Sequence, residues 1–151
     1  MVGLEISGLE ITRIVAELNE VLKDYYVNNI NAIDETTWLI RLHHSTNPEK
    51  RLIISLAKGI WLTSYEIPTR PPDTFVTHLR ELLLRGRFIN VEQPDVERLV
   101  KIRFMVDKIA RTLIAELFGG GNLLVVDEKG CILTIFKKIE VRHRRLAQGL
   151  Y

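Results

Sequence analysis

The stretch RLVKIRFMVDKIARTLIAEL, residues 98–117, carries the clearest structural pattern in the sequence. In its first half every second residue is apolar, which places one face of an extended strand in a core: Val100, Ile102, Phe104 and Val106. Asp107-Lys108 reads as a two-residue hairpin turn, and Ala110–Leu117 as the returning strand. The stretch therefore predicts an antiparallel hairpin that covers a hydrophobic core with one face.

Further short runs of β-forming residues, each bounded by turn residues, lie on both sides of this hairpin. The expected strands are 25–33, 36–43, 51–56, 60–63, 88–91, 123–126 and 131–136. Two amphipathic helices are expected at about 8–23 and 74–85. Ser7 and Asp73 are their expected N-caps, and Gly86 is placed to end the second helix. Together these elements predict an α+β fold, a β-sandwich flanked by two main helices.

Length and composition indicate one domain, residues 1–151. The chain is 46% hydrophobic and 26% charged, which is typical of a folded globular protein. Its apolar runs are shorter than the roughly 20 residues that cross a bilayer, so no membrane association is expected. Glu5 and Glu10 interrupt any secretory signal pattern, and a cytoplasmic location is expected.

Neither a metal nor a cofactor is expected. Cys131 is the only cysteine, so it cannot form an internal disulfide, and its apolar strand predicts a buried, inert thiol. His43 and His44 are adjacent, so on a strand they would point to opposite faces and could not share a metal ion.

The sequence also lacks a catalytic constellation. Gly119-Gly120-Gly121 is not followed by the Gly-Lys-Ser/Thr of a P-loop, so a flexible hairpin loop is favoured over a phosphate cradle. No motif for a serine or cysteine nucleophile is present. We therefore expect a binding protein and not an enzyme.

Arg98 has two interpretations. It lies in phase with the apolar face of its strand, at the edge, where a guanidinium needs either a partner or a ligand. The first interpretation pairs Arg98 with a carboxylate such as Glu97 or Glu10, and periodicity alone favours it. In the second, Arg98 is presented to a ligand phosphate or base. Glu10 is equally ambiguous, because a carboxylate that caps a helix can also face a ligand.

Basic residues form two clusters along the chain. One contains Arg80, Arg85 and Arg87, and the other contains Lys137, Lys138, Arg142, Arg144 and Arg145. A solvated face is the ordinary explanation of such clusters, whereas convergence in space would make a surface that follows phosphates. The net charge of +2 does not choose between these explanations. The candidates for stacking on bases are Tyr25, Tyr26 and Trp61.

Several stretches, in order, resemble the N-terminal domain of the NFACT family. The family includes the nuclear export mediator factor, RqcH-type proteins and proteins labelled fibronectin-binding protein A. The resemblance runs almost end to end through these stretches: Ser7–Glu10 with Glu17–Asn19, Asn29-Ile30 with Ile33, Ile60–Thr63 with Pro68, Pro71, Pro72, Phe75, Leu79 and Arg80, then Glu97-Arg98, and Gly121–Asp127.

The resemblance implies a fold, a function and partners. The implied fold is that of the N-terminal domain of formamidopyrimidine-DNA glycosylases. The implied function is a tRNA-binding module of a ribosome quality-control factor. Such a factor binds large ribosomal subunits with a stalled peptidyl-tRNA and supports C-terminal tailing of the nascent chain. Family proteins are several times longer, so this chain is expected to be a fragment of a longer multidomain protein.

The resemblance also implies site residues. The family has an aspartate in the opening helix and an Asp-Arg pair associated with tRNA. Here Glu10 and Glu97 stand at the aspartate positions, and Arg98 retains the arginine. The implied tRNA-binding residues are therefore Arg98, Glu97 and Glu10. The candidate phosphate contacts are Arg80, Arg85, Arg87, Arg142 and Arg145.

Two alternatives remain open at this point. A glycosylase-like domain could bind or process nucleic acid, but such enzymes attack with an N-terminal proline amine, and this chain begins Met1-Val2-Gly3. Duplex DNA is therefore not the expected partner. A protein-interaction module of the fibronectin-binding type is the other alternative.

Overall fold

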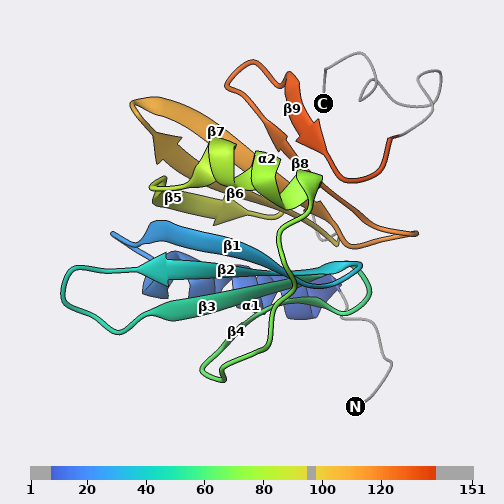
Figure 1. Cartoon of the computed structure of the whole chain (residues 1–151). Helices are drawn as coiled ribbons and strands as arrows, with labels where there is room; N and C mark the ends of the chain where they lie inside the picture. Colours follow the sequence, from blue (N-terminus) through green and yellow to red (C-terminus); the bar gives the residue numbers. More distant parts are fainter. Residues whose placement is uncertain (1–7, 95–97, 139–151) are drawn as a thin grey trace.

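Two antiparallel meanders and two helices make up the computed structural model, which describes residues 8–94 and 98–138 (Figure 1). The helices are α1 (Gly8–Val21) and α2 (Thr74–Leu83). The first meander is β1 (Tyr26–Asp34), β2 (Thr37–His43), β3 (Lys50–Ser55) and β4 (Gly59–Thr63). The second meander is β5 (Arg87–Glu92), β6 (Leu99–Val106), β7 (Ile109–Glu116), β8 (Asn122–Val126) and β9 (Ile132–Ile135).

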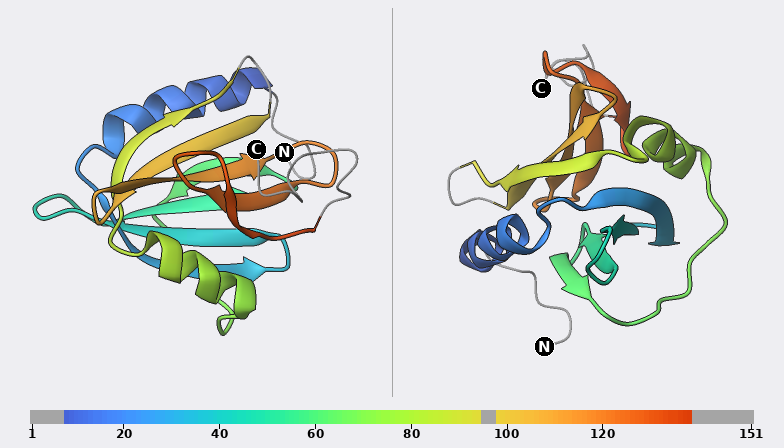
Figure 2. Two further views of the ribbon diagram at one scale, coloured as in Figure 1. Left: turned by 90° about the horizontal axis from the view of Figure 1, so that it is seen from above. Right: turned by 90° about the vertical axis from the view of Figure 1, so that its left-hand side faces the viewer.

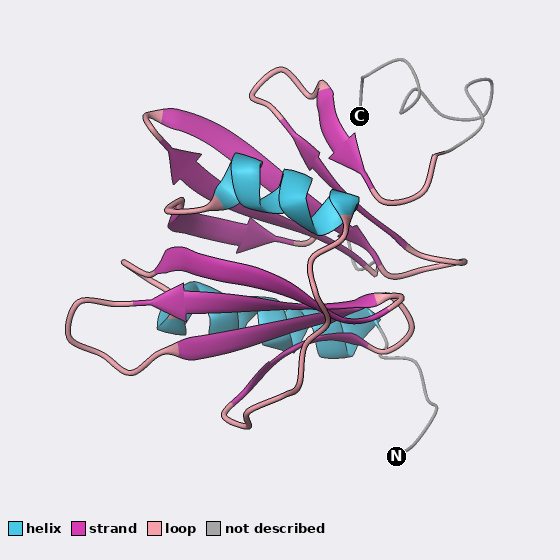
Figure 3. Ribbon diagram, viewed as in Figure 1, coloured by secondary structure: helices cyan, strands magenta, loops and turns pink. Residues whose placement is uncertain are grey.

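The meanders join at a narrow seam between β1 and β5. The strand order is β4-β3-β2-β1-β5-β6-β7-β8-β9, and one residue pair, Tyr26 with Arg87, connects the halves in register. Backbone hydrogen bonds of 2.9 Å from Val27 N to Gly86 O and from Arg85 N to Val27 O reinforce this seam. The chain bends there, so the two meanders lie in separate layers (Figures 1 and 3).

A single hydrophobic core fills the space between the layers. Alternate residues of the strands face it, as the strict alternation of burial along β6 shows. The helices lie at opposite edges of the two layers, with α1 against β4 and β5, and α2 against β1, β6 and β9 (Figure 2). Asn19 fixes α1 to β5 through two hydrogen bonds to the backbone of Val91, of 2.8 and 2.9 Å.

Three aromatic rings close the core under α2. Trp38 on β2 is 2% exposed, and its ring centroid lies 4.9 Å from that of Phe136 and 5.8 Å from that of Phe75. Phe75 and Phe136 are 5.4 Å apart, so each ring contacts the other two. The cluster ties α2 and the segment after β9 to the first meander.

The two ends of α2 are formed in different ways, the first by a side-chain cap and the second by a left-handed residue. The Asp73 side chain accepts a 2.8 Å hydrogen bond from Val76 N and caps the helix, as the sequence predicts. The prediction that Gly86 ends the helix is wrong, because Arg85 takes the left-handed conformation, with φ of 68°. Gly86 is needed for a different reason: a Cβ there would lie 2.9 Å from Leu83 O and 3.0 Å from Val106.

Replacing Arg85 with glycine is expected to raise the free energy of unfolding by about 1 kcal/mol, since glycine carries no penalty for the left-handed conformation after a helix. Urea denaturation measures the change. Arg87→Gly is the matched control and should lower stability, because Arg87 lies in an extended strand. Equal losses in the two variants would contradict this account of Arg85.

Most of the expected elements are confirmed. The α+β class, the two helices and the strand sequence are present, and Asp107 and Lys108 both have positive φ, of 49° and 69°, as the expected tight turn requires. The first helix ends earlier than expected, at Val21, and its expected cap, Ser7, lies outside the described residues. The likeness to glycosylases stays a prediction.

Two predictions of burial are wrong. Cys131 is half-buried, because it sits at the end of a turn where its backbone N–H donates to the Asp127 carboxylate, at 2.9 Å. Tyr25, expected to be available for stacking, is 1% exposed and its hydroxyl donates to Pro48 O at 2.8 Å. Burial raises the pKa of the Tyr25 phenol, which keeps this donor protonated.

Candidate nucleic-acid interface

Four segments that are distant in sequence lie at the same end of the molecule. They are the start of α1, the adjoining ends of β5 and β6, the loop between β7 and β8, and the residues after β9 (Figures 1 and 2). Thr12 on α1 donates a 2.6 Å hydrogen bond to Gln93 after β5, and Leu117 N donates a 2.7 Å bond to Arg98 O. We call this region the glycine-loop end.

The loop between β7 and β8 depends on its glycines. Gly119 and Gly121 have φ of 60° and 78°, and Gly121 N donates to Phe118 O at 2.9 Å, which closes a tight turn. A Cβ on Gly121 would lie 2.8 Å from Leu56 Cβ, so only glycine fits. The ring of Phe118 is 37% exposed beside this turn.

Lysine is held against the same loop. The Lys137 ammonium donates to Gly120 O at 2.8 Å. The Asn122 side chain binds both the N–H and the carbonyl of Lys137, each at 3.0 Å. These contacts fix the course of the chain after β9, and Lys137 and Lys138 are exposed there. The loop therefore carries positive charge beside an exposed aromatic ring.

Arg98 and Glu10 reach the glycine-loop end from different elements. Glu10 is exposed on the first turn of α1, and Arg98 is half-buried directly before β6. Each has a polar partner within the molecule. An arginine has five N–H donors, so it can hold more than one partner at a time. The third residue expected at the site, Glu97, lies outside the described residues.

The other candidate phosphate contacts do not gather there. Arg85 and Arg87 lie at the opposite end of β5 from Arg98, separated by the length of the six-residue strand, about 20 Å. Arg80 is half-buried, and its Nε–H donates to Ile30 O at 2.8 Å, which anchors α2 to β1. Arg142 and Arg145 fall outside the described residues.

Sequence reasoning missed Phe118. Its position between a buried strand and three glycines is the signal that could have found it, because a loop that cannot bury its side chains exposes an apolar neighbour. Trp61, a stacking candidate from the sequence, is half-buried in an apolar hollow of about 240 Å³ on the outer side of the first meander, with Ile33, Ile53 and Ile67.

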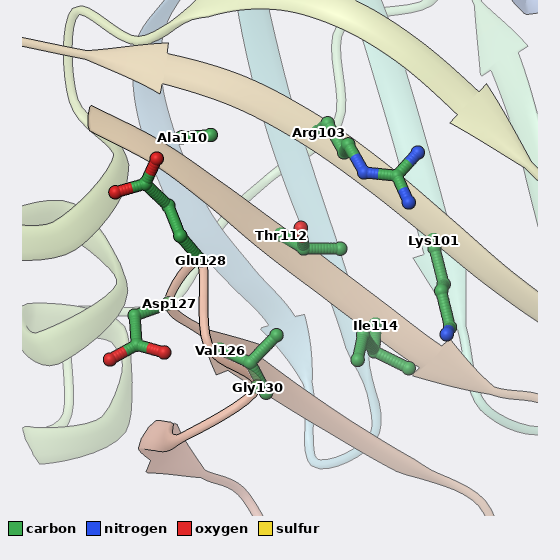
Figure 4. Close-up of a pocket in the computed structure, with 9 residues that line it drawn as sticks. All are labelled: Lys101, Arg103, Ala110, Thr112, Ile114, Val126, Asp127, Glu128 and Gly130. Atoms are coloured by element: carbon green, nitrogen blue, oxygen red, sulfur yellow. The ribbon is translucent and has the colours of Figure 1, made fainter. Parts of the chain in front are cut away.

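A hollow of about 370 Å³ on the outer face of β6, β7 and β8 is the alternative site (Figure 4). Lys101 and Arg103 stand on one side of it, and Asp127 and Glu128 on the other. Arg103 is ion-paired with Glu92 at 2.8 Å. Because the charges oppose one another, this surface is poorly suited to a polyanion.

The described ranges, 8–94 and 98–138, contain no group of three His, Cys, Asp or Glu side chains that could hold a metal ion. No helix within these ranges is long and apolar enough to cross a membrane.

The chain matches the family described as NFACT N-terminal and middle domains over residues 7–150. It is 33% identical over 134 residues to the human ribosome quality control complex subunit NEMF, covering 87% of this chain and 12% of that protein. It is 28% identical over 138 residues to the archaeal Rqc2 homolog aRqcH of Methanocaldococcus jannaschii, covering 85% of this chain and 20% of that protein. The chain therefore spans a small part of these relatives.

The fold is similar to solved N-terminal structures. The N-terminal domain of fibronectin-binding protein PavA from Streptococcus pneumoniae superposes with a TM-score of 0.82 at 27% identity, covering 89% of this chain and 54% of that one. The fibrinogen binding protein from Staphylococcus aureus gives a TM-score of 0.77 at 27% identity, covering 90% and 52%.

Proposed function

The chain belongs to the NFACT family as an NFACT N-terminal domain, and from that premise we propose that it is a tRNA-binding module of a ribosome quality-control factor. Its larger partner would be a large ribosomal subunit that carries a stalled peptidyl-tRNA. Its role would be to support C-terminal tailing of the nascent chain. Two relatives named above are ribosome quality-control proteins, which supports this assignment.

The observation that carries the proposal is the placement of Arg98 at the glycine-loop end. The start of α1 brings Glu10 to this end, and the residues after β9 bring Lys137 and Lys138. A guanidinium and two lysines at one end of the molecule, with an acidic group on α1, suit the phosphates and base edges of folded RNA. Phe118 adds a ring on which an unpaired base could stack.

We propose that the domain binds RNA without catalysing a reaction of its own. Arg98 would contact the tRNA, Glu10 and Glu97 would position that contact, and the lysines would supply affinity for phosphates. In this proposal the domain prefers folded RNA to duplex DNA. The contact is made by a single arginine among loops, whereas proteins that read duplex DNA usually insert a helix into the major groove.

Arg98→Ala is expected to weaken tRNA binding by about 1–3 kcal/mol. It should also reduce the slope of log affinity against log salt concentration by about the amount that one phosphate contact contributes. A salt titration of tRNA affinity, with duplex DNA as competitor, measures both quantities. Arg103→Ala is the matched control. It removes an arginine five positions further on, in β6, whose guanidinium pairs with Glu92 and borders the hollow on the outer face.

Two results would contradict the proposal. If both arginine variants bind tRNA as tightly as the unchanged chain, Arg98 is a structural residue. If the folded domain binds tRNA and duplex DNA equally well, the preference for folded RNA is wrong.

Protein binding is the second candidate function, and the match to fibronectin- and fibrinogen-binding proteins favours it. Fibronectin affinity that persists at high salt would support this candidate, since exposed ionic contacts weaken as salt rises.

A further inference from the structure

A row of exposed side chains crosses the seam between the two layers, far from the glycine-loop end. Tyr26 on β1 pairs directly with His43 on β2 and with Arg87 on β5. Residues directly opposite in antiparallel strands share a face, with their Cβ atoms about 5 Å apart. His43, Tyr26 and Arg87 therefore form a continuous line, which we call the seam row.

Each member of the seam row faces solvent. Tyr26 is 44% exposed, and His43 and Arg87 are exposed. The next residues along this cross-strand line are Met105, opposite Arg87, and Ala110, opposite Met105. Neither is acidic, so the strand pairing places no carboxylate in the row. The acidic residue nearest to the row in sequence is Asp24, two residues before Tyr26, in a turn outside the line. The Tyr26 ring lies between two basic side chains and is partly open to solvent.

The two arginines at the seam differ from most of the other arginines in their side-chain contacts. Arg41 and Arg51 form ion pairs with Glu49, and Arg111 donates to Leu82 O. Among the residues that the structure describes, neither Arg85 nor Arg87 has a side-chain hydrogen bond or ion pair. Their charges are thus available to an external anion.

Arg85 is placed beside the row at a conformational cost. Its φ of 68° is a left-handed conformation that most side chains avoid, and its N–H donates to Val27 O at the seam. A glycine would hold this backbone with less strain but would present no charge. Arg87 therefore supplies an unpaired cation directly across from Tyr26, and Arg85 supplies a second one at the seam.

We propose that the seam row, with Arg85, is a second RNA-binding surface, which takes an unpaired base of a single strand. The base stacks on Tyr26, and the adjoining phosphates lie against Arg85, Arg87 and His43. A ring flanked by cations is the arrangement by which proteins bind single strands without reading their sequence. The inference rests on the proposed function in one respect, the assumption that the partner is RNA. It does not depend on the Arg98 site, because this surface lies about 20 Å from Arg98.

The test uses the whole 151-residue chain and an oligoadenylate of about ten nucleotides, a length within the span of one such surface. Tyr26→Leu keeps the apolar bulk at the seam but removes the π face. It is expected to weaken oligoadenylate binding about tenfold, the order of one base stacked on one aromatic ring. Tyr26→Phe, which keeps the ring, should bind as the unchanged chain does.

Two further measurements separate this surface from the glycine-loop end. A blunt RNA duplex offers no unpaired base, so its affinity should be the same for Tyr26→Leu and Tyr26→Phe. Arg98→Ala should weaken tRNA binding but preserve the difference in oligoadenylate affinity between Tyr26→Leu and Tyr26→Phe, so the two surfaces can fail independently.

The proposal is overturned if the folded chain does not bind oligoadenylate, or if Tyr26→Leu binds it as tightly as Tyr26→Phe. It is also overturned if only the double variant Arg85→Ala and Arg87→Ala weakens binding, because the seam would then be an electrostatic face without stacking.

Discussion

Trp38→Ala is expected to lower the free energy of unfolding by about 3–5 kcal/mol, the usual cost of removing a large buried aromatic ring. Trp38 is 2% exposed and contacts two other rings, from α2 and from the segment after β9. Its loss would leave a cavity that both layers border. Urea denaturation followed by far-UV circular dichroism measures the change without depending on tryptophan fluorescence.

Trp61→Ala is the matched control, since it removes the same side chain from a half-buried position on the outer face of β4. Less apolar area is buried there, so a smaller loss is expected. If Trp38→Ala and Trp61→Ala lower the free energy of unfolding equally, the aromatic cluster stabilises the core no more than a half-buried tryptophan does.

Gly121→Val is expected to cost roughly 2–4 kcal/mol of stability, from the sum of a left-handed β-branched residue and an overpacked contact. The φ of 78° and the 2.8 Å approach to Leu56 Cβ supply these two causes. Thermal denaturation gives the stability change. The same variant should bind tRNA more weakly, because the displaced loop would move Phe118 and the Gly120 carbonyl that holds Lys137.

Gly119→Val separates the two causes. Gly119 has φ of 60°, but a Cβ there would meet nothing within 4 Å. Only the conformational cost should remain, about 1–2 kcal/mol. If the two valine variants are equally unstable, the contact with Leu56 is not a determinant of the loop.

The strands could be predicted because their burial follows a period of two that the sequence displays directly. Val100, Ile102, Phe104 and Val106 are all buried, as the alternation requires. The end of α2 could not be predicted, because glycine is the usual residue for a left-handed position and Arg85 occupies it instead. The burial of Tyr25 depends on Pro48, which is distant in sequence and contacts it only in the folded chain.

The candidate site was predictable in part. Arg98 stands in phase with the buried face at the edge of its strand, and the structure places it half-buried at that edge. Periodicity offered Glu10 only as one of several possible partners, since the docking of α1 on β5 is a long-range contact that no local pattern predicts. The separation of Arg85 and Arg87 from Arg98 follows from the direction of β5, which no local pattern reveals.

The narrow seam also orders the way the chain can fold. Neighbouring strands within each meander are consecutive in sequence, so they close short loops at little entropic cost. The pairing of β1 with β5 and the docking of Asn19 on Val91, 72 residues apart, bring together the two halves of the chain. We therefore expect the meanders to form early and the step that joins them to come last. The seam row and the glycine-loop end are both completed by that step, so a half-folded chain would possess neither of the two surfaces proposed to bind RNA.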